Sequence, residues 1–152
     1  MRQVESSIII NCRPQEVIAA FLDHKHLKNW WGVERSLIEK RINGTYALAW
    51  QISESGIKYL SAGLITSYDS RYELIISNFI YCNPDRPILG PMRLELQAHE
   101  LNPKQCKLIL IQSGYQTGEH WDWYYEAVVH AWPLALEELK KSLLSQAFSG
   151  AL

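Results

Sequence analysis

The sequence lacks any apolar run long enough to cross a membrane, since an α-helical span needs about 20 consecutive apolar residues. Near the N-terminus only Ile8–Ile10 is continuously apolar, and that run is too short for the apolar region of a signal peptide. An excess of either charge is also missing, because fifteen Lys and Arg residues face sixteen Asp and Glu residues. Without a positive field to attract phosphates, we expect no nucleic-acid partner, and we expect no membrane span.

Cysteine is scarce and widely spaced: the chain has only Cys12, Cys82 and Cys106, and no Cys-x-x-Cys pair. This pattern argues against a disulfide framework and against a zinc site. His24 and His26 stand two residues apart, which places them on different faces of a helix. We therefore expect no metal and no cofactor, and a cytoplasmic protein with reduced thiols.

Hydrophobic residues make up 47% of the chain and charged residues 20%, a balance typical of a folded globular protein. A length of 152 residues fits one domain and leaves little room for two. We therefore expect residues 1–152 to form a single domain.

The first third of the chain predicts a strand followed by two short helices. The segment Val4–Cys12 is rich in β-branched residues, which favour strands. Pro14 then stands where the first residue of a helix is expected, because its missing N–H would be unpaired at that position. A second short helix should end at Gly32, a residue that commonly terminates helices.

In the remaining two thirds of the chain, the spacing of the apolar residues changes once. Between residues 44 and 115 apolar side chains alternate and turns recur, which predicts five or six strands, and Gly63 suggests a bulge or bend in one of them. From residue 118 to residue 148 the helical period returns, and Pro133 should bend this helix without ending it. Strands joined by short turns pair antiparallel, and only the long helix is large enough to cover their sheet. The sequence thus predicts an α+β fold, a curved antiparallel sheet of about six or seven strands around a long C-terminal helix.

Three segments carry a resemblance to a known group: Pro14–Val17 after the first strand, Leu27–Gly32, and Ala131–Leu136 followed by Leu139 and Lys140. They resemble the START-like superfamily, also called SRPBCC, and the branch similar to the C-terminal domain of the heat-shock-protein-90 ATPase activator. In this sequence Ala131 replaces that branch's Gly before the helical Trp, and Val33 replaces its Pro after Trp-Trp-Gly. The resemblance implies the helix-grip fold, shared with birch-pollen allergens, and a cavity between sheet and helix.

Aromatic residues supply the candidate binding site. Seven of them fall on faces that should point toward the space between the sheet and the long helix, and their side chains either line a ligand cavity or fill the core. These residues are Trp30, Trp31, Tyr46, Trp50, Trp121, Tyr125 and Trp132. Trp123 lies nine residues from Trp132, which places it about 180° around the helix. It therefore either packs on a loop or at an irregular start of the helix, or belongs to a homodimer or protein-partner contact.

Three functions remain open from the sequence. The first is the binding of a hydrophobic small molecule or lipid without catalysis, which requires a mostly apolar cavity. The second is a cyclase-like or other small-molecule enzyme, whose candidate acid–base groups would be Glu119, His120, Asp122 and Glu126 near the start of the last helix. The third is a chaperone-associated protein-interaction module, which requires a filled core and an exposed patch near Trp123.

Overall fold

The computed structural model describes residues 2–150, and the side chains of residues 2–145. The chain begins with β1 (Gln3–Ile10), α1 (Pro14–Ala20), α2 (His24–Trp31) and β2 (Arg35–Ile38). It continues with β3 (Thr45–Ser53), β4 (Gly56–Asp69), β5 (Glu73–Cys82), β6 (Leu89–Asn102), β7 (Gln105–Ser113) and α3 (Glu119–Gly150). This order confirms the predicted succession of strand, two short helices, strands and long helix.

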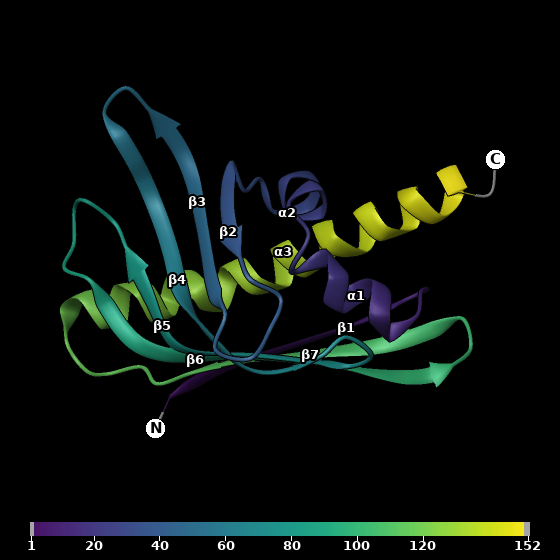
Figure 1. The fold of residues 1–152 in the computed structure, drawn as a ribbon. Helices are drawn as coiled ribbons and strands as arrows, with labels where there is room; N and C mark the ends of the chain where they lie inside the picture. The colour runs from purple at the N-terminus through teal and green to yellow at the C-terminus, as the bar shows by residue number, and fades with distance from the viewer. Residues whose placement is uncertain (1, 151–152) are drawn as a thin grey trace.

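The seven strands within residues 2–150 form one antiparallel sheet in the order β1-β7-β6-β5-β4-β3-β2. The strands β1, β6 and β7 lie beneath α3, whereas β2, β3 and β4 rise steeply beside it (Figure 1). The curvature expected from the sequence is therefore present. None of the helices in the described part of the chain is long and apolar enough to cross a membrane.

The short helices form where their terminal residues predict them. Pro14 occupies the first position of α1, and the Glu16 carboxylate accepts a hydrogen bond of 2.9 Å from the Arg13 backbone N–H. Gly32 ends α2 in the left-handed conformation, with φ of 69°, which a residue without a side chain adopts at little cost. The long helix α3 continues through Pro133, as its apolar stripe indicates.

A bulge in β4 helps the sheet to bend. The pairing of β4 with β5 shifts register between Ala62 and Leu64, on either side of Gly63. A Cβ atom on Gly63 would lie 2.7 Å from Cγ2 of Ile76 and 2.8 Å from the Ser77 carbonyl oxygen. The two strands therefore approach too closely for any side chain at this position, and only glycine fits there. The bulge at Gly63 agrees with the bulge or bend predicted from the sequence.

The core lies between the sheet, α1, α2 and α3. Alternate residues of β6 and β7 point into it, among them Leu94, Leu96, Leu108 and Leu110, which are fully buried. The apolar residues Ile109 and Ile111 share β7 with two of them but are only half-buried, because they point to the other face.

Candidate functional site

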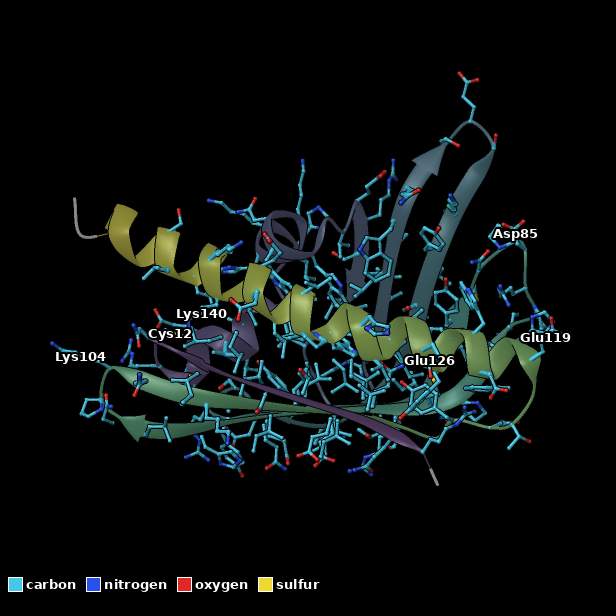
Figure 2. All side chains as sticks on the ribbon, turned by 180° about the vertical axis from the view of Figure 1, so that it is seen from behind. Cys12, Asp85, Lys104, Glu119, Glu126 and Lys140 are labelled. Atoms are coloured by element: carbon cyan, nitrogen blue, oxygen red, sulfur yellow. The ribbon has the colours of Figure 1, made fainter. Side chains whose placement is uncertain are left out.

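A groove of about 420 Å³ lies between α3 and the rising strands β3, β4 and β5. Its α3 residues run from Trp123 to Ala135, the part of the helix that carries the labelled Glu126 in Figure 2. Fourteen described residues line it: Trp31, Trp50, Tyr59, Ser61, Phe79, Tyr81, Gln112, Trp123, Tyr124, Ala127, Val128, Ala131, Trp132 and Ala135. Every one of them is uncharged, and eight are aromatic.

One face of α3 forms the first wall of the groove. Ala127, Ala131 and Ala135 follow one another at intervals of four residues, so they lie above one another on the helix. Their methyl groups take little room, and the groove occupies the space that larger side chains would fill. Trp123 and Trp132 stand at opposite edges of this face, since nine residues correspond to about 180° of rotation.

The sheet forms the second wall. Trp50 of β3 lies directly opposite Tyr59 of β4, and Ser61 of β4 lies opposite Tyr81 of β5. Alternate residues of a strand share one face, so Tyr59 and Ser61 point to the same side of the sheet. Both residues line the groove together with residues of α3, so this face of the bent sheet is turned toward the helix.

Trp31 closes one end of the groove by joining three elements. Its ring stacks on Trp30, with centroids 4.9 Å apart and planes inclined by 9°. It also meets Trp50 of β3 at 5.1 Å and Trp132 of α3 at 5.2 Å. The Trp50 indole N–H donates a hydrogen bond of 2.9 Å to the Trp31 carbonyl oxygen. Offset and edge-to-face aromatic contacts of this kind are favourable and hold the end wall in place.

A buried polar network crosses the groove wall. Gln112 of β7 is only 1% exposed, and a buried amide is costly unless its hydrogen bonds are satisfied. The Trp132 indole Nε1–H donates to Gln112 Oε1 at 2.8 Å, and Gln112 Nε2 donates to the Tyr124 hydroxyl oxygen at 3.0 Å. Burial raises the pKa of the Tyr124 hydroxyl well above its ordinary value, although the hydrogen bond from Gln112 opposes this effect.

The mouth of the groove carries a cation. The guanidinium carbon of Arg86 lies 3.7 Å from the centroid of the Trp123 ring, a close cation–π contact. Arg86 Nη1 also lies 3.3 Å from Nδ1 of His120. Within the described part of the chain Arg86 belongs to no ion pair. Trp123 itself is 37% exposed, so this end of the groove is open to solvent.

Three of the seven residues predicted to line a cavity do line the groove: Trp31, Trp50 and Trp132. Trp30 and Tyr46 lie in the core instead, where each satisfies its polar atom with a backbone carbonyl. The Trp30 indole donates to the Ala20 oxygen at 2.8 Å, and the Tyr46 hydroxyl donates to the Phe21 oxygen at 2.7 Å.

Trp121 and Tyr125 do not line the groove, although they fall on the same helical stripe as Trp132. Trp121 is eleven residues from Trp132, which corresponds to roughly 16 Å along the helix axis. Under those first turns of α3 the space is filled by Tyr115, whose ring centroid lies 6.2 Å from that of Trp121 and 5.2 Å from that of Tyr125. Trp123 and Tyr124 lie at the same height on α3 and do line the groove. Packing against Tyr115, and not distance along the helix, therefore keeps Trp121 and Tyr125 out of the lining.

Sequence reasoning missed several lining residues. Trp123 was expected to stand apart from the stripe, but it lines the groove, because the lining face spans the full angle between Trp123 and Trp132. Tyr124 lies four residues before Val128 and eight before Trp132, a helical spacing that could have revealed it. Ser61 and Gln112 carry no comparable signal, because nothing in a polar residue of a strand predicts a buried position.

The candidate acid–base groups at the start of α3 do not line the groove. Asp122 instead pairs with Arg2 at 2.8 Å, and His120 contacts Arg86. Figure 2 places Glu119 beside the loop that carries Asp85, at the end of the molecule, and Glu126 on the outer side of α3. The groove therefore presents hydroxyl, amide and aromatic groups, which bind by shape, dispersion and hydrogen bonding.

A curved antiparallel sheet around a long C-terminal helix, with two short helices after the first strand, defines the helix-grip fold of START-like proteins. The chain belongs to the family described as Activator of Hsp90 ATPase homolog 1-like protein, whose model matches residues 11–143. This confirms the resemblance noted in the sequence. Among proteins with curated descriptions, none matches the chain.

Solved structures of the same fold come from several bacteria. The solution structure of the Aha1 dimer from Colwellia psychrerythraea has a TM-score of 0.69 at 14% identity, over 94% of this chain and 96% of that chain. An AHSA1 protein from Silicibacter pomeroyi gives 0.70 at 16% identity, over 95% and 99% of the two chains. A Nitrosomonas europaea protein gives 0.73 at 14% identity, over 95% and 96%. At these identities the likeness shows the fold.

Proposed function

We propose that this protein binds a hydrophobic small molecule or lipid in the groove between the sheet and α3, and that it does so without catalysing a reaction. The observation that carries this proposal is the groove itself, about 420 Å³ in volume and lined by uncharged, mainly aromatic residues. Ligand pockets in proteins commonly enclose about 300–1,000 Å³ and combine apolar walls with a few polar groups.

The size of the groove sets the expected affinity. A ligand that buries about 300 Å² of apolar surface gains roughly 7 kcal/mol before the cost of association. The Gln112–Tyr124 network adds polar contacts, while lost translational and rotational freedom opposes binding. We therefore expect dissociation constants in the micromolar range.

The chemistry of the lining supports binding over catalysis. An enzyme of the cyclase type needs an ionisable group that changes its protonation near the working pH. The described lining residues include no carboxylate, imidazole, amine or thiol, and burial raises the pKa of Tyr81 and of Tyr124. Both hydroxyls therefore keep their protons at neutral pH.

Native mass spectrometry of the freshly purified protein, paired with a denatured run, tests the proposal directly. We expect a non-covalent extra mass that disappears on denaturation, or one that appears after incubation with fatty acids, flavonoids or sterols. A clean mass of the chain alone after incubation with the whole panel would refute small-molecule binding.

A matched pair of helix variants locates the site. Ala131 lines the groove and its side chain is exposed, so Ala131→Phe should fill the groove without disturbing the core. Leu134 is 70% exposed, does not line the groove and lies on the same helix, so Leu134→Phe is the control. We expect Ala131→Phe to weaken ligand binding at least about tenfold, as loss of roughly half the apolar contact implies. Equal binding by both variants would place the ligand elsewhere.

A second candidate function is a chaperone-associated protein interaction, which family membership favours together with the exposed Trp123 and its Arg86 partner. One similar structure is described as an Aha1 dimer. The candidate predicts stimulation of an Hsp90 ATPase, and Trp123→Ala should abolish it. If sedimentation shows a non-monomeric wild type that Trp123→Ala leaves unchanged, a dimer contact at Trp123 is wrong.

We also propose that the protein is cytoplasmic. Its three cysteines are free, which suits a reducing compartment. Fractionation of the native cells, followed by immunoblotting, should recover the protein with cytoplasmic markers, and recovery with extracytoplasmic markers would contradict this location.

A further inference from the structure

The hydrogen bonds that link Trp132, Gln112 and Tyr124 can run in one direction only, because the indole of Trp132 can donate but not accept. Trp132 Nε1 is a donor without acceptor capacity, and it lies 2.8 Å from Gln112 Oε1. The reversed amide would place the Gln112 NH₂ group against the indole N–H, so that two donors would face each other. The orientation of the Gln112 side chain is therefore set by Trp132.

That orientation determines the state of the Tyr124 hydroxyl. With Oε1 turned to Trp132, the Gln112 amide nitrogen donates both its hydrogens, to Tyr124 Oη at 3.0 Å and to Met92 Sδ at 3.5 Å. The Tyr124 oxygen is thus an acceptor in this contact. Its own hydrogen must point elsewhere, to a second acceptor.

No such acceptor exists among the described residues. The ring of Tyr81 lies close, with its centroid 4.6 Å from that of Tyr124, but no hydrogen bond joins the two hydroxyls. Tyr124 is only 6% exposed, so bulk water is largely excluded from it. Tyr124 lines the groove, so a ligand that fills the groove and displaces water leaves this donor unpaired unless the ligand supplies an acceptor.

The partner must be an uncharged oxygen. Every described lining residue is uncharged, and Arg86 stacks on Trp123 at the mouth without lining the groove. A carboxylate or phosphate beside Tyr124 would therefore be buried without a countercharge among the lining residues. Burial raises the Tyr124 pKa and keeps the hydroxyl protonated, which preserves its role as a donor at neutral pH. Ser61, which is 7% exposed and lies in the same lining, has no side-chain hydrogen bond to another described residue and offers a second polar contact.

We propose that the ligand of the groove is an apolar molecule that carries a neutral carbonyl oxygen, and that Tyr124 donates a hydrogen bond to this oxygen. The inference rests on the proposed function and adds the chemical class of the ligand. Tyr124 is the residue that distinguishes a carbonyl-bearing ligand from a hydrocarbon of the same shape.

Two compounds of nearly equal shape provide the test: 2-acetylnaphthalene, which has the carbonyl, and 2-isopropenylnaphthalene, which has a methylene group in its place. Equilibrium dialysis yields both dissociation constants for the wild type and for Tyr124→Phe. The readout is the ratio of the two constants within one protein, which cancels any general loss of packing in the variant. We expect Tyr124→Phe to reduce the preference for the ketone about tenfold, the usual effect of one buried hydrogen bond.

Tyr115→Phe is the matched control, because Tyr115 lies in the same ring cluster, 6.1 Å from Tyr124, but does not line the groove. It should keep the wild-type preference. An unchanged preference in Tyr124→Phe, with both compounds still bound, would overturn the role of Tyr124 and leave the proposed function standing. Binding of neither compound would overturn the inference, while the native mass measurement decides the proposed function separately.

Discussion

Removal of the Tyr115 hydroxyl should make the protein more stable. Tyr115 is 6% exposed, and its hydroxyl oxygen has no hydrogen-bond partner within the described residues. The ring itself packs against Trp121, Tyr124 and Tyr125. Tyr115→Phe keeps those ring contacts and deletes only the unpaired polar atom.

The magnitude follows from two opposing effects. A buried polar group without a partner costs about 1–3 kcal/mol. The small void left by the missing oxygen gives back part of this gain, about 1 kcal/mol by comparison with deletions of single buried groups. The net expectation is a stabilisation of about 1 kcal/mol, or about 2–4 °C in Tm for a chain of this size.

Tyr46→Phe is the control, since it deletes the same atom from another buried tyrosine. Tyr46 is 0% exposed, and its hydroxyl donates a hydrogen bond of 2.7 Å to the Phe21 carbonyl oxygen. Its removal should therefore destabilise the protein by about 1 kcal/mol or more, opposite in sign to Tyr115→Phe.

Urea denaturation with equal slopes for the three proteins would measure both changes. If Tyr115→Phe lowers the free energy of unfolding as much as Tyr46→Phe does, the Tyr115 hydroxyl has a partner in solution, and the reasoning is wrong.

Three further predictions concern pH and packing. Because folding raises the pKa of Tyr115 and Tyr124, neither group makes the free energy of unfolding depend on pH below about pH 10. Above it, each lowers that free energy by about 1.4 kcal/mol per pH unit. Urea midpoints measured from pH 8 to pH 11 should fall accordingly, and more shallowly in Tyr115→Phe; a flat profile would contradict the burial of these hydroxyls. Gly63→Ala should destabilise the protein by about 2 kcal/mol or more, because its Cβ would overlap backbone and side-chain atoms of β5; a change below about 0.5 kcal/mol in urea denaturation would show that the strands can separate. The guanidinium of Arg71 lowers the pKa of Asp69 to about 2, so Arg71→Ala should return that pKa toward its ordinary value in an NMR titration, whereas no change would mean that the pair is absent in solution.

The local signals of the chain predicted most of the fold. Pro14 and Gly32 mark ends of the two short helices because their effect depends only on the backbone at their own positions. The change from a period of two to a period near 3.6 likewise reflects which face of each element is buried. Strand β2, with four residues, was missed, because so short a segment holds too few alternations to be recognised.

The lining of the groove could not be predicted, because it depends on how the helices pack against the sheet and against one another. Trp30 and Trp31 are neighbours in the sequence and differ by about 100° around α2. One is buried in the core at 5% exposure, and the other joins α2 to β3 and α3 at the end of the groove. No pattern in the chain separates them, because the difference arises only when α2 meets its two neighbours.

The amino-acid sequence by itself determined the order of elements, the family and the aromatic character of the interior, since these depend on residue type and spacing. Only the tertiary structure decided which aromatics face the groove and which fill the core. It also brought Gln112 of β7 between Trp132 and Tyr124 of α3. Such contacts join residues far apart in the chain, and their geometry is set by the bend of the sheet against the helix.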